Sequence, residues 1–390
     1  MPKVVVIIID GVGVGSTPDA VEYNDVGGNT LCNIAAKIGG LDLPNLQELG
    51  LGNIAEILGV KKKSDCAGSF GKMKAQSRGK DSTTGHWEIG GLITNYSFPV
   101  YPNGFPKEII EKFIQLNKLE GILGNKAASG TEIIFELGEE HIRTGFPIVY
   151  TSADSVFQIA AHEEVIPVEK LYEICNVTRD KIMTGEHAVG RIIARPFIGE
   201  IGNFSRTYRR KDYALEAHGD MIFDLLVQNS IVTIGIGKIN DLFAYRNINK
   251  QIKTKSNLEG IQETIKTISE EENSYIMTNL VDFDVNFGHR NDAAGFSTAL
   301  KEFDNHLLDI LTALKTNDIL MITSDHGNDP TFPGTDHTRE FVPLLVYGRN
   351  IRRSVDLGIR ETFADVSKTI CDFYQINNNL SGNSFYSELR

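Results

Sequence analysis

Cysteine is scarce in this sequence, and its few copies are not paired. The chain has 4 cysteines among 390 residues, and none of them forms a C-x-x-C motif. Disulfide-stabilised domains and zinc fingers both depend on closely or regularly spaced cysteines. We therefore expect neither a disulfide framework nor a zinc finger. The pattern is typical of reduced thiols in a cytoplasmic protein.

Long hydrophobic runs and an excess of positive charge are also missing. The apolar run at residues 4–9 is far shorter than the ~20 residues that cross a membrane, and no later run approaches that length. The formal net charge is −12 at pH 7, whereas broad nucleic-acid binding needs a basic face that neutralises phosphates. We expect no membrane association and no nucleic-acid partner.

What the chain does have is an alternation of strands and helices. Residues 4–9, 232–236, 275–280 and 319–323 are apolar runs of strand length. Apolar residues at helical spacing, from Phe296 to Leu314, lie between the last two runs. This alternation predicts an α/β fold with a mostly parallel sheet that is flanked by helices.

The middle of the chain differs from its flanks. Residues 97–216 are punctuated by prolines, contain short strands of their own and carry a series of arginines. Residues suited to metal binding lie on both sides of this stretch. We therefore predict a discontinuous catalytic core, residues 1–96 and 217–390, into which a smaller α/β cap domain, residues 97–216, is inserted.

Acidic and imidazole side chains follow the predicted strands. Asp10 ends the first strand, and Asp325 and His326 come just after the run at 319–323, the edge at which open α/β sheets bind ligands. Oxygen and nitrogen donors together suit divalent transition metals. Three carboxylates and three imidazoles can hold two ions and leave positive charge for a phosphate, as two-metal phosphoryl transfer requires. The candidate ligands are Asp10, Asp284, His289, Asp325, His326 and His337.

A second constellation places three hydroxyls in a row, at Ser82, Thr83 and Thr84. A hydroxyl is a weak nucleophile at neutral pH unless a base or a metal ion favours its alkoxide. The alternative role is a helix N-cap, because Ser or Thr followed by Glu is common where helices begin. The two roles are compatible, since the N–H groups at a helix N-terminus also favour a phosphate.

Arginines of the middle segment are candidates for a second phosphate site. The guanidinium groups of Arg191 and Arg206 match phosphate oxygens in two-pronged hydrogen bonds. The alternative is a solvated basic face, and these residues alone leave both interpretations open.

Together these motifs resemble the phosphopentomutase family, within the alkaline-phosphatase superfamily of metalloenzymes. The likeness runs over nearly the whole chain, and its most specific part is Pro-Gly-Thr-Asp-His-Thr-Arg-Glu at residues 333–340. The other matching stretches are residues 80–88, 150–155, 281–284, 287–290 and 323–329. The resemblance implies an alkaline-phosphatase-like core.

The resemblance also implies roles for individual residues. It implies two manganese ions, one held by Asp284, His289 and His337 and the other by Asp10, Asp325 and His326. It implies a phosphorylated hydroxyl at Ser82, where the family often has Thr, with Thr84 as the alternative. A sugar bisphosphate is an implied activator, and the implied contacts of the sugar phosphate are Asp154, Arg191, Arg206 and Lys238.

The implied activity is that of an isomerase, an intramolecular phosphotransferase. It interconverts α-D-ribose 1-phosphate, or the 2-deoxy sugar, with the 5-phosphate through a phosphoenzyme and a bound bisphosphate. This reaction links nucleoside salvage to pentose phosphate metabolism.

Three other activities are alternatives. A metal-dependent phosphatase or phosphodiesterase on the same core predicts free phosphate as product, and Arg191 and Arg206 count against it. A phosphoglycerate mutase is disfavoured because the middle-segment motifs match the pentose family. A non-catalytic metal-binding protein is disfavoured because all the candidate ligands and the hydroxyl are present.

Overall fold

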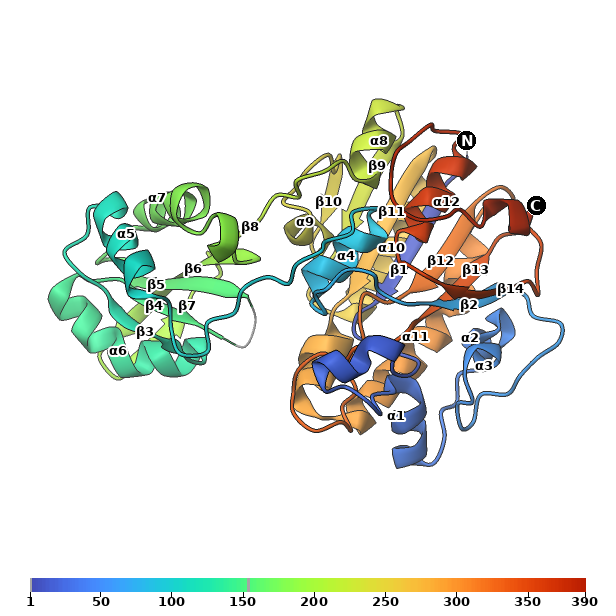
Figure 1. Ribbon diagram of the computed structural model, residues 1–390, viewed down its shortest axis with the longest axis horizontal. Helices are drawn as coiled ribbons and strands as arrows, with labels where there is room; N and C mark the ends of the chain where they lie inside the picture. Colours follow the sequence, from blue (N-terminus) through green and yellow to red (C-terminus); the bar gives the residue numbers. More distant parts are fainter. Residues whose placement is uncertain (1, 153–154) are drawn as a thin grey trace. The chain divides into compact units, whose positions relative to one another are not determined.

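The computed structural model describes residues 2–152 and 155–390. The chain forms two compact units (Figure 1, where the colours follow the sequence from the N-terminus to the C-terminus). Unit 1 comprises residues 1–97 and 217–390, and unit 2 comprises Phe98–Glu216.

Unit 1 is built on a mostly parallel sheet. Within the described residues this sheet has 8 strands, and every neighbouring pair is parallel except the two pairs that involve β13. In spatial order the strands are β10 (Lys250–Ile252), β9 (Val232–Ile236), β11 (Ser274–Leu280), β1 (Val4–Ile9), β12 (Ile319–Thr323), β13 (Val342–Tyr347), β2 (Ser69–Met73) and β14 (Asp356–Arg360).

Helices cover both faces of this sheet (Figure 1), so β1 in its middle is buried along its whole length. On one face, Val5, Ile7 and Ile9 share a core cluster with residues of α1 (Thr30–Ile38), α2 (Pro44–Leu49), α10 (Asn257–Glu270) and α11 (Ala293–Ala313). The other face carries α4 (Ser82–Ile89), α8 (Ile222–Gln228) and α12 (Asp365–Phe373). The remaining short helices of the unit include α3 (Leu51–Ile54) and α9 (Ile239–Leu242).

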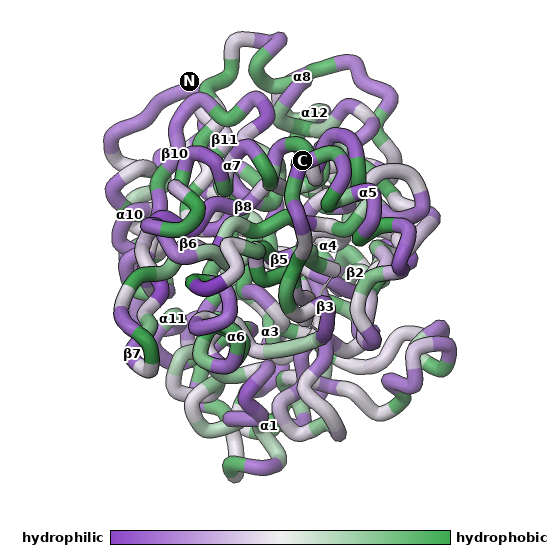
Figure 2. The backbone as a smooth tube through the Cα atoms, turned by 90° about the vertical axis from the view of Figure 1, so that its left-hand side faces the viewer, coloured by the Kyte–Doolittle hydropathy of each residue, from purple (hydrophilic) through white to green (hydrophobic). Residues whose placement is uncertain are grey.

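Unit 2 has its own sheet and its own core. Its strands are β3 (Leu123–Ala127), β4 (Ile148–Thr151), β5 (Val156–His162), β6 (Arg191–Glu200) and β7 (Asn203–Arg206), and β8 (Lys211–Ala214) pairs with β6. The central strand β5 is buried throughout, and its largely hydrophobic segment is green in Figure 2. Residues of α5 (Lys107–Asn117) and α7 (Val168–Val177) form one core cluster, and residues of α6 (Gly130–Thr144) form another.

Each unit thus combines helices with a sheet, and the predicted α/β class is confirmed. The apolar residues from Phe296 to Leu307 are buried on α11, as their spacing predicted. The cysteines at 32, 66, 175 and 371 are free. In the described part of the chain, no helix combines the length and apolar character needed to cross a membrane.

A buried ion pair joins the starts of two central strands. Lys3 precedes β1 and places its Nζ 3.1 Å from Oδ2 of Asp318, which precedes β12; both side chains are shielded from solvent. Asp318 also accepts the backbone N–H groups of Lys3 and Lys315. Because β1 and β12 pair directly, this ion pair helps to hold the register that aligns the opposite ends of the two strands.

We expect the two partners to respond unequally to substitution. Asp318→Ala leaves the Lys3 ammonium buried without a counter-charge and should lower the free energy of unfolding by about 3–5 kcal/mol. Lys3→Met leaves Asp318 with two backbone donors and should cost less. Urea unfolding measured by circular dichroism compares the variants. A Lys3→Met protein at least as destabilised as Asp318→Ala would contradict this account.

Candidate metal centre and nucleophile

Three adjacent parallel strands deliver the acidic ligands to one edge of the sheet. Asp10 directly follows β1, and Asp325 lies just beyond the end of β12. Asp284 lies in the short helix η4 (Phe283–Phe287), which follows β11. All three carboxylates are at most 2% exposed. Since the strands run side by side, residues far apart in the sequence meet at this edge.

Asp10, Asp325 and His326 form the first triad of candidate metal ligands. The Nε2 atom of His326 lies 3.4 Å from Oδ1 of Asp10 and 3.3 Å from Oδ2 of Asp325. Both of these oxygens are buried, and within the described residues neither accepts a well-aligned hydrogen bond. Buried carboxylate oxygens that lack donors and face a neighbouring imidazole nitrogen fit a bound cation.

Asp284 and His337 form a second group of candidate ligands together with His326, and His289, which the resemblance assigned to this group, lies beside them. The Nε2 atom of His337 lies 3.3 Å from Oδ1 of Asp284, and that of His289 lies 3.2 Å from Oδ2 of the same carboxylate. The two Nε2 atoms are 3.2 Å apart. The structure thus places all six candidate ligands that the sequence suggested close to one another.

A short antiparallel bridge explains how His337 reaches the centre. Gly327 and Thr338 exchange backbone hydrogen bonds of 3.3 and 2.8 Å. This bridge places the residues next to them side by side, and the rings of His326 and His337 stack with centroids 3.8 Å apart.

The electrostatics of the site also favour cation binding. Burial, together with the charges of Asp325 and Asp284, raises the pKa of Asp10 well above its usual value. Burial opposes the ionisation of Asp325 too, but His326 and His86 hold its pKa at about 2. Burial lowers the pKa of His326 to about 4, which keeps the imidazole neutral, the form that ligates metals. The donor chemistry and the crowded negative charge fit two divalent ions.

Ser82 stands beside the first triad. It is the first residue of α4, and its Oγ lies 3.2 Å from Nε2 of His326. The hydroxyl of Thr84, in contrast, donates to Oδ2 of Asp81 at 2.7 Å. The alternative that a hydroxyl caps this helix is wrong: Asp81 is the N-cap and accepts the backbone N–H of Thr84 at 3.1 Å.

The predicted substrate contacts are distributed over both units. Lys238 of unit 1 is the N-cap of α9 and lies close enough to Asp10 to favour ionisation of that carboxyl. Arg191 and Arg206 belong to unit 2. Asp154 lies outside the described residues.

The two arginines of unit 2 belong to one cluster of guanidinium groups. Arg206 lines a pocket of about 180 Å³ together with Arg195 and Arg210. Arg210 makes a two-pronged ion pair with Asp212, and Nη1 of Arg191 lies 3.5 Å from Oδ2 of the same carboxylate. Arg191 and Arg195 are half-buried, so the cluster is not a wholly solvated face.

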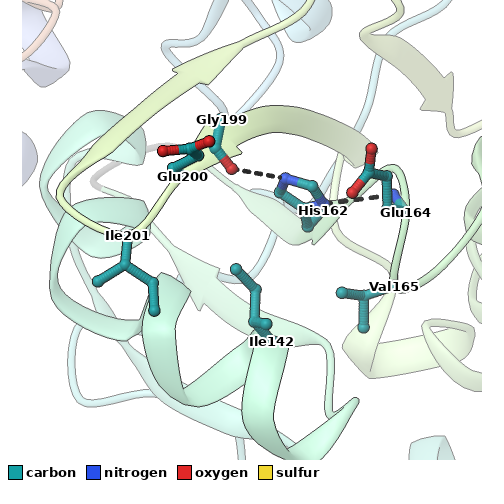
Figure 3. Close-up of a pocket in the computed structure, with 7 residues that line it drawn as sticks. All are labelled: Ile142, His162, Glu164, Val165, Gly199, Glu200 and Ile201. Carbon is teal, nitrogen blue, oxygen red and sulfur yellow. Dashed lines mark hydrogen bonds between the residues drawn. The ribbon is translucent and has the colours of Figure 1, made fainter.

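A larger pocket of unit 2, of about 430 Å³, does not suit metal or phosphate binding (Figure 3). The side chains of Ile142, Val165 and Ile201 point into it. Nε2 of His162 donates to a backbone carbonyl at 3.0 Å, and Nδ1 accepts the N–H of Glu164 at 3.3 Å. Both imidazole nitrogens are therefore used internally, and we assign this pocket no role.

Sequence reasoning missed the residues that hold the ligand loops together. Buried Glu340 accepts the backbone N–H groups of Gly15 and Thr30 and the hydroxyls of Thr30 and Thr338. It thereby joins the loop after β1 to the loop that carries His337. The only signal for it was its place in the specific run at residues 333–340.

Arg339 joins the segment that leads to Ser82 to the loop that carries His337. Its buried guanidinium pairs with Asp19 and donates to backbone carbonyls of Ala75, Ser77 and Gly79. The nucleophile segment and the second ligand group therefore share one anchor.

Comparison with known proteins places this geometry among metalloenzymes. Residues 2–378 match the family model of the Metalloenzyme superfamily. A phosphopentomutase from Dictyoglomus turgidum is 54% identical over 391 residues, which cover 100% of this chain and 98% of the relative. A phosphopentomutase from Carboxydothermus hydrogenoformans is 54% identical over 390 residues and 100% of both chains.

One solved structure resembles the fold over its full length. The PH0037 protein from Pyrococcus horikoshii matches with a TM-score of 0.50 at 14% identity, covering 98% of this chain and 99% of that chain. At this identity the likeness concerns the fold alone.

Glu340 generates a prediction about stability and pH. Burial raises its pKa from 4.5 to about 7, although four donors oppose the shift. Between these values the folded state binds more protons than the unfolded state, so this group's contribution to stability falls as the pH rises. Glu340→Gln can keep all four contacts, since its amide oxygen accepts the two N–H groups and its amide nitrogen donates to the two hydroxyls.

We therefore expect Glu340→Gln to gain stability relative to the unaltered protein as the pH rises from 5 to 8, by up to about 3 kcal/mol. Urea unfolding of metal-free protein at several pH values measures the difference. Parallel stability curves for the two proteins would show that Glu340 does not titrate in this range.

Proposed function

We propose a function from the family: the chain belongs to the phosphopentomutase family of metalloenzymes, which are isomerases. We propose that it interconverts α-D-ribose 1-phosphate, or its 2-deoxy form, with the corresponding 5-phosphate. The phosphoryl group is transferred through a phosphoserine at Ser82. One observation carries the proposal: Ser82 Oγ lies 3.2 Å from Nε2 of His326, the imidazole of the first triad. A hydroxyl in that position is next to the groups that can favour its alkoxide.

The metal centre follows the two groups of ligands. Asp10, Asp325 and His326 would hold one divalent ion, and Asp284, His289 and His337 the other. When bound, the ions, which we propose are Mn²⁺, stabilise the negative charge of the transferring phosphoryl group. The neutral His326 and the ionised Asp325 are already in the protonation states that binding requires.

Ser82 carries the phosphoryl group between two positions of the sugar. A free hydroxyl of the pentose monophosphate attacks the phosphorus on Ser82, so a sugar O–P bond forms and the Oγ–P bond breaks. The proton of the attacking hydroxyl passes, on balance, to the Ser82 oxygen. After the bisphosphate reorients, Oγ takes its other phosphoryl group and the sugar oxygen regains a proton. The first turn of α4 contributes the positive end of a helix beside this oxygen.

The sugar phosphate that does not react needs ligands of its own. We assign this role to Arg191 and Arg206 in unit 2 and to Lys238 in unit 1, with Asp154 on the sugar. Guanidinium groups bind phosphate oxygens in two-pronged fashion, and Arg191 and Arg206 belong to the cluster around Asp212 and the 180 Å³ pocket.

The cycle returns Ser82 to its phosphorylated form, so it needs priming only once. A sugar bisphosphate can supply the first phosphoryl group, because it is also the bound intermediate. In the cell this activity connects nucleoside salvage with pentose phosphate metabolism, and we place it in the cytoplasm.

Ser82 and Thr84 provide a matched pair for testing the nucleophile. Ser82→Ala should abolish isomerisation of ribose 5-phosphate, a loss of at least about 10³-fold, because no oxygen remains beside His326. Thr84→Val removes only the bond to Asp81 and should retain transfer within about tenfold.

A coupled assay of ribose 1-phosphate formation measures the turnover of each variant. Intact-protein mass spectrometry, after treatment with a sugar bisphosphate primer, measures its phosphorylation. The unaltered protein and Thr84→Val should each gain one phosphoryl group, and Ser82→Ala none. Turnover that survives in Ser82→Ala but disappears in Thr84→Val would move the role to Thr84.

A further inference from the structure

A fully buried histidine of the nucleophile helix faces the first triad. His86 is one turn after Ser82 on α4 and is 0% exposed. Its Nδ1 lies 2.7 Å from the carbonyl oxygen of Ser82 and 3.1 Å from Oδ2 of Asp325. It belongs to neither group of candidate metal ligands, and its Nδ1 is engaged by the Ser82 carbonyl, so its role must act through these neighbours.

The contacts of His86 define its tautomer. Both oxygens beside Nδ1 can only accept hydrogen bonds, so Nδ1 carries the hydrogen. On the other side of the ring, Nε2 lies 3.3 Å from the amide nitrogen of Asn279, which can only donate. Nε2 is therefore the acceptor.

Asn279 extends the connection to Asp10. Its amide nitrogen also donates to Oδ2 of Asp10 at 2.8 Å, and this bond determines the orientation of the amide. Asn279 lies in β11 and is buried among apolar strand residues. A continuous path of contacts thus runs from Asp325 through His86 and Asn279 to Asp10.

The helix backbone is in direct contact with the ligand loop at the same place. A Cβ on Gly85 would lie 2.1 Å from the carbonyl oxygen of Asp325. Residue 85 therefore leaves no room for a side chain between α4 and this loop. The ring of His86 connects the two, in addition to the contact of Ser82 with His326.

We infer that His86 is a positioning residue. Its Nδ1–H donates to the Ser82 carbonyl and faces Asp325 Oδ2 at 3.1 Å, so the ring sets the position of this carboxylate relative to the helix. Asn279 holds the ring in one tautomer and aligns Asp10. This inference rests on the proposed metal centre and nucleophile. Groups that orient metal ligands from outside typically change metal affinity by 10- to 100-fold when they are lost.

Two substitutions of His86 distinguish a positioning role from a role in packing alone. In His86→Asn, the amide nitrogen can take the place of Nδ1–H, whereas in His86→Gln the longer side chain can replace only the Nε2 acceptor. We expect His86→Asn to bind Mn²⁺ at the first site within about threefold of the unaltered protein. We expect His86→Gln to lose 10- to 100-fold in that affinity and, at saturating Mn²⁺, to show a lower kcat with an unchanged KM for ribose 5-phosphate.

Calorimetric titration with Mn²⁺ gives the stoichiometry and affinity of each protein, and thermal unfolding of the metal-free forms controls for folding. Equal effects of the two substitutions, or a greater loss in His86→Asn, would overturn the inference. An unaltered protein that binds fewer than two ions would instead contradict the proposed metal centre itself.

The tautomer can be tested without any change to the ring. In ¹H–¹⁵N NMR spectra of the unaltered metal-free protein, with His86→Asn used to assign the resonance, His86 should show a protonated Nδ1 and an unprotonated Nε2. The opposite tautomer would overturn the inference even if neither variant folds.

Discussion

The structure of unit 1 depends on the burial of three carboxylates at one point. Asp10, Asp284 and Asp325 meet at the end of adjacent parallel strands, where solvent is excluded and their charges repel one another. Such a concentration of negative charge persists only when cations and hydrogen-bond donors compensate for it. Three histidines, Lys238 and, in the proposed enzyme, two divalent ions provide that compensation.

The surrounding structure holds this unfavourable arrangement in place. The Lys3–Asp318 pair secures the far ends of β1 and β12, whereas Glu340 and Arg339 tie together the loops at the near end. Helix α4 then presents Ser82 to the first triad, with no side chain separating Gly85 from the ligand loop. Rigid strands and short, tied loops are what preorganised phosphoryl transfer requires.

The sequence predicted the parts of the centre that follow from strand ends. A β-branched run that stops at Asp10, and an apolar run that leads to Asp325, place both carboxylates at the same edge of any parallel sheet. It did not predict Asn279, because a polar residue inside a buried strand gives no periodic signal. Nor did it predict Asp81 as the N-cap, because the hydroxyls that follow are also good capping residues. Glu340 and His86 act through contacts with distant loops, which spacing along the chain cannot reveal.

The most direct measurement is a phosphorus NMR time course of the purified protein with Mn²⁺, a trace of sugar bisphosphate and ribose 5-phosphate. We expect a ribose 1-phosphate signal to grow to a constant ratio with its isomer while no inorganic phosphate appears. Steady accumulation of inorganic phosphate would contradict it. In that case water, rather than a sugar hydroxyl, accepts the phosphoryl group from Ser82, and the protein is a phosphatase.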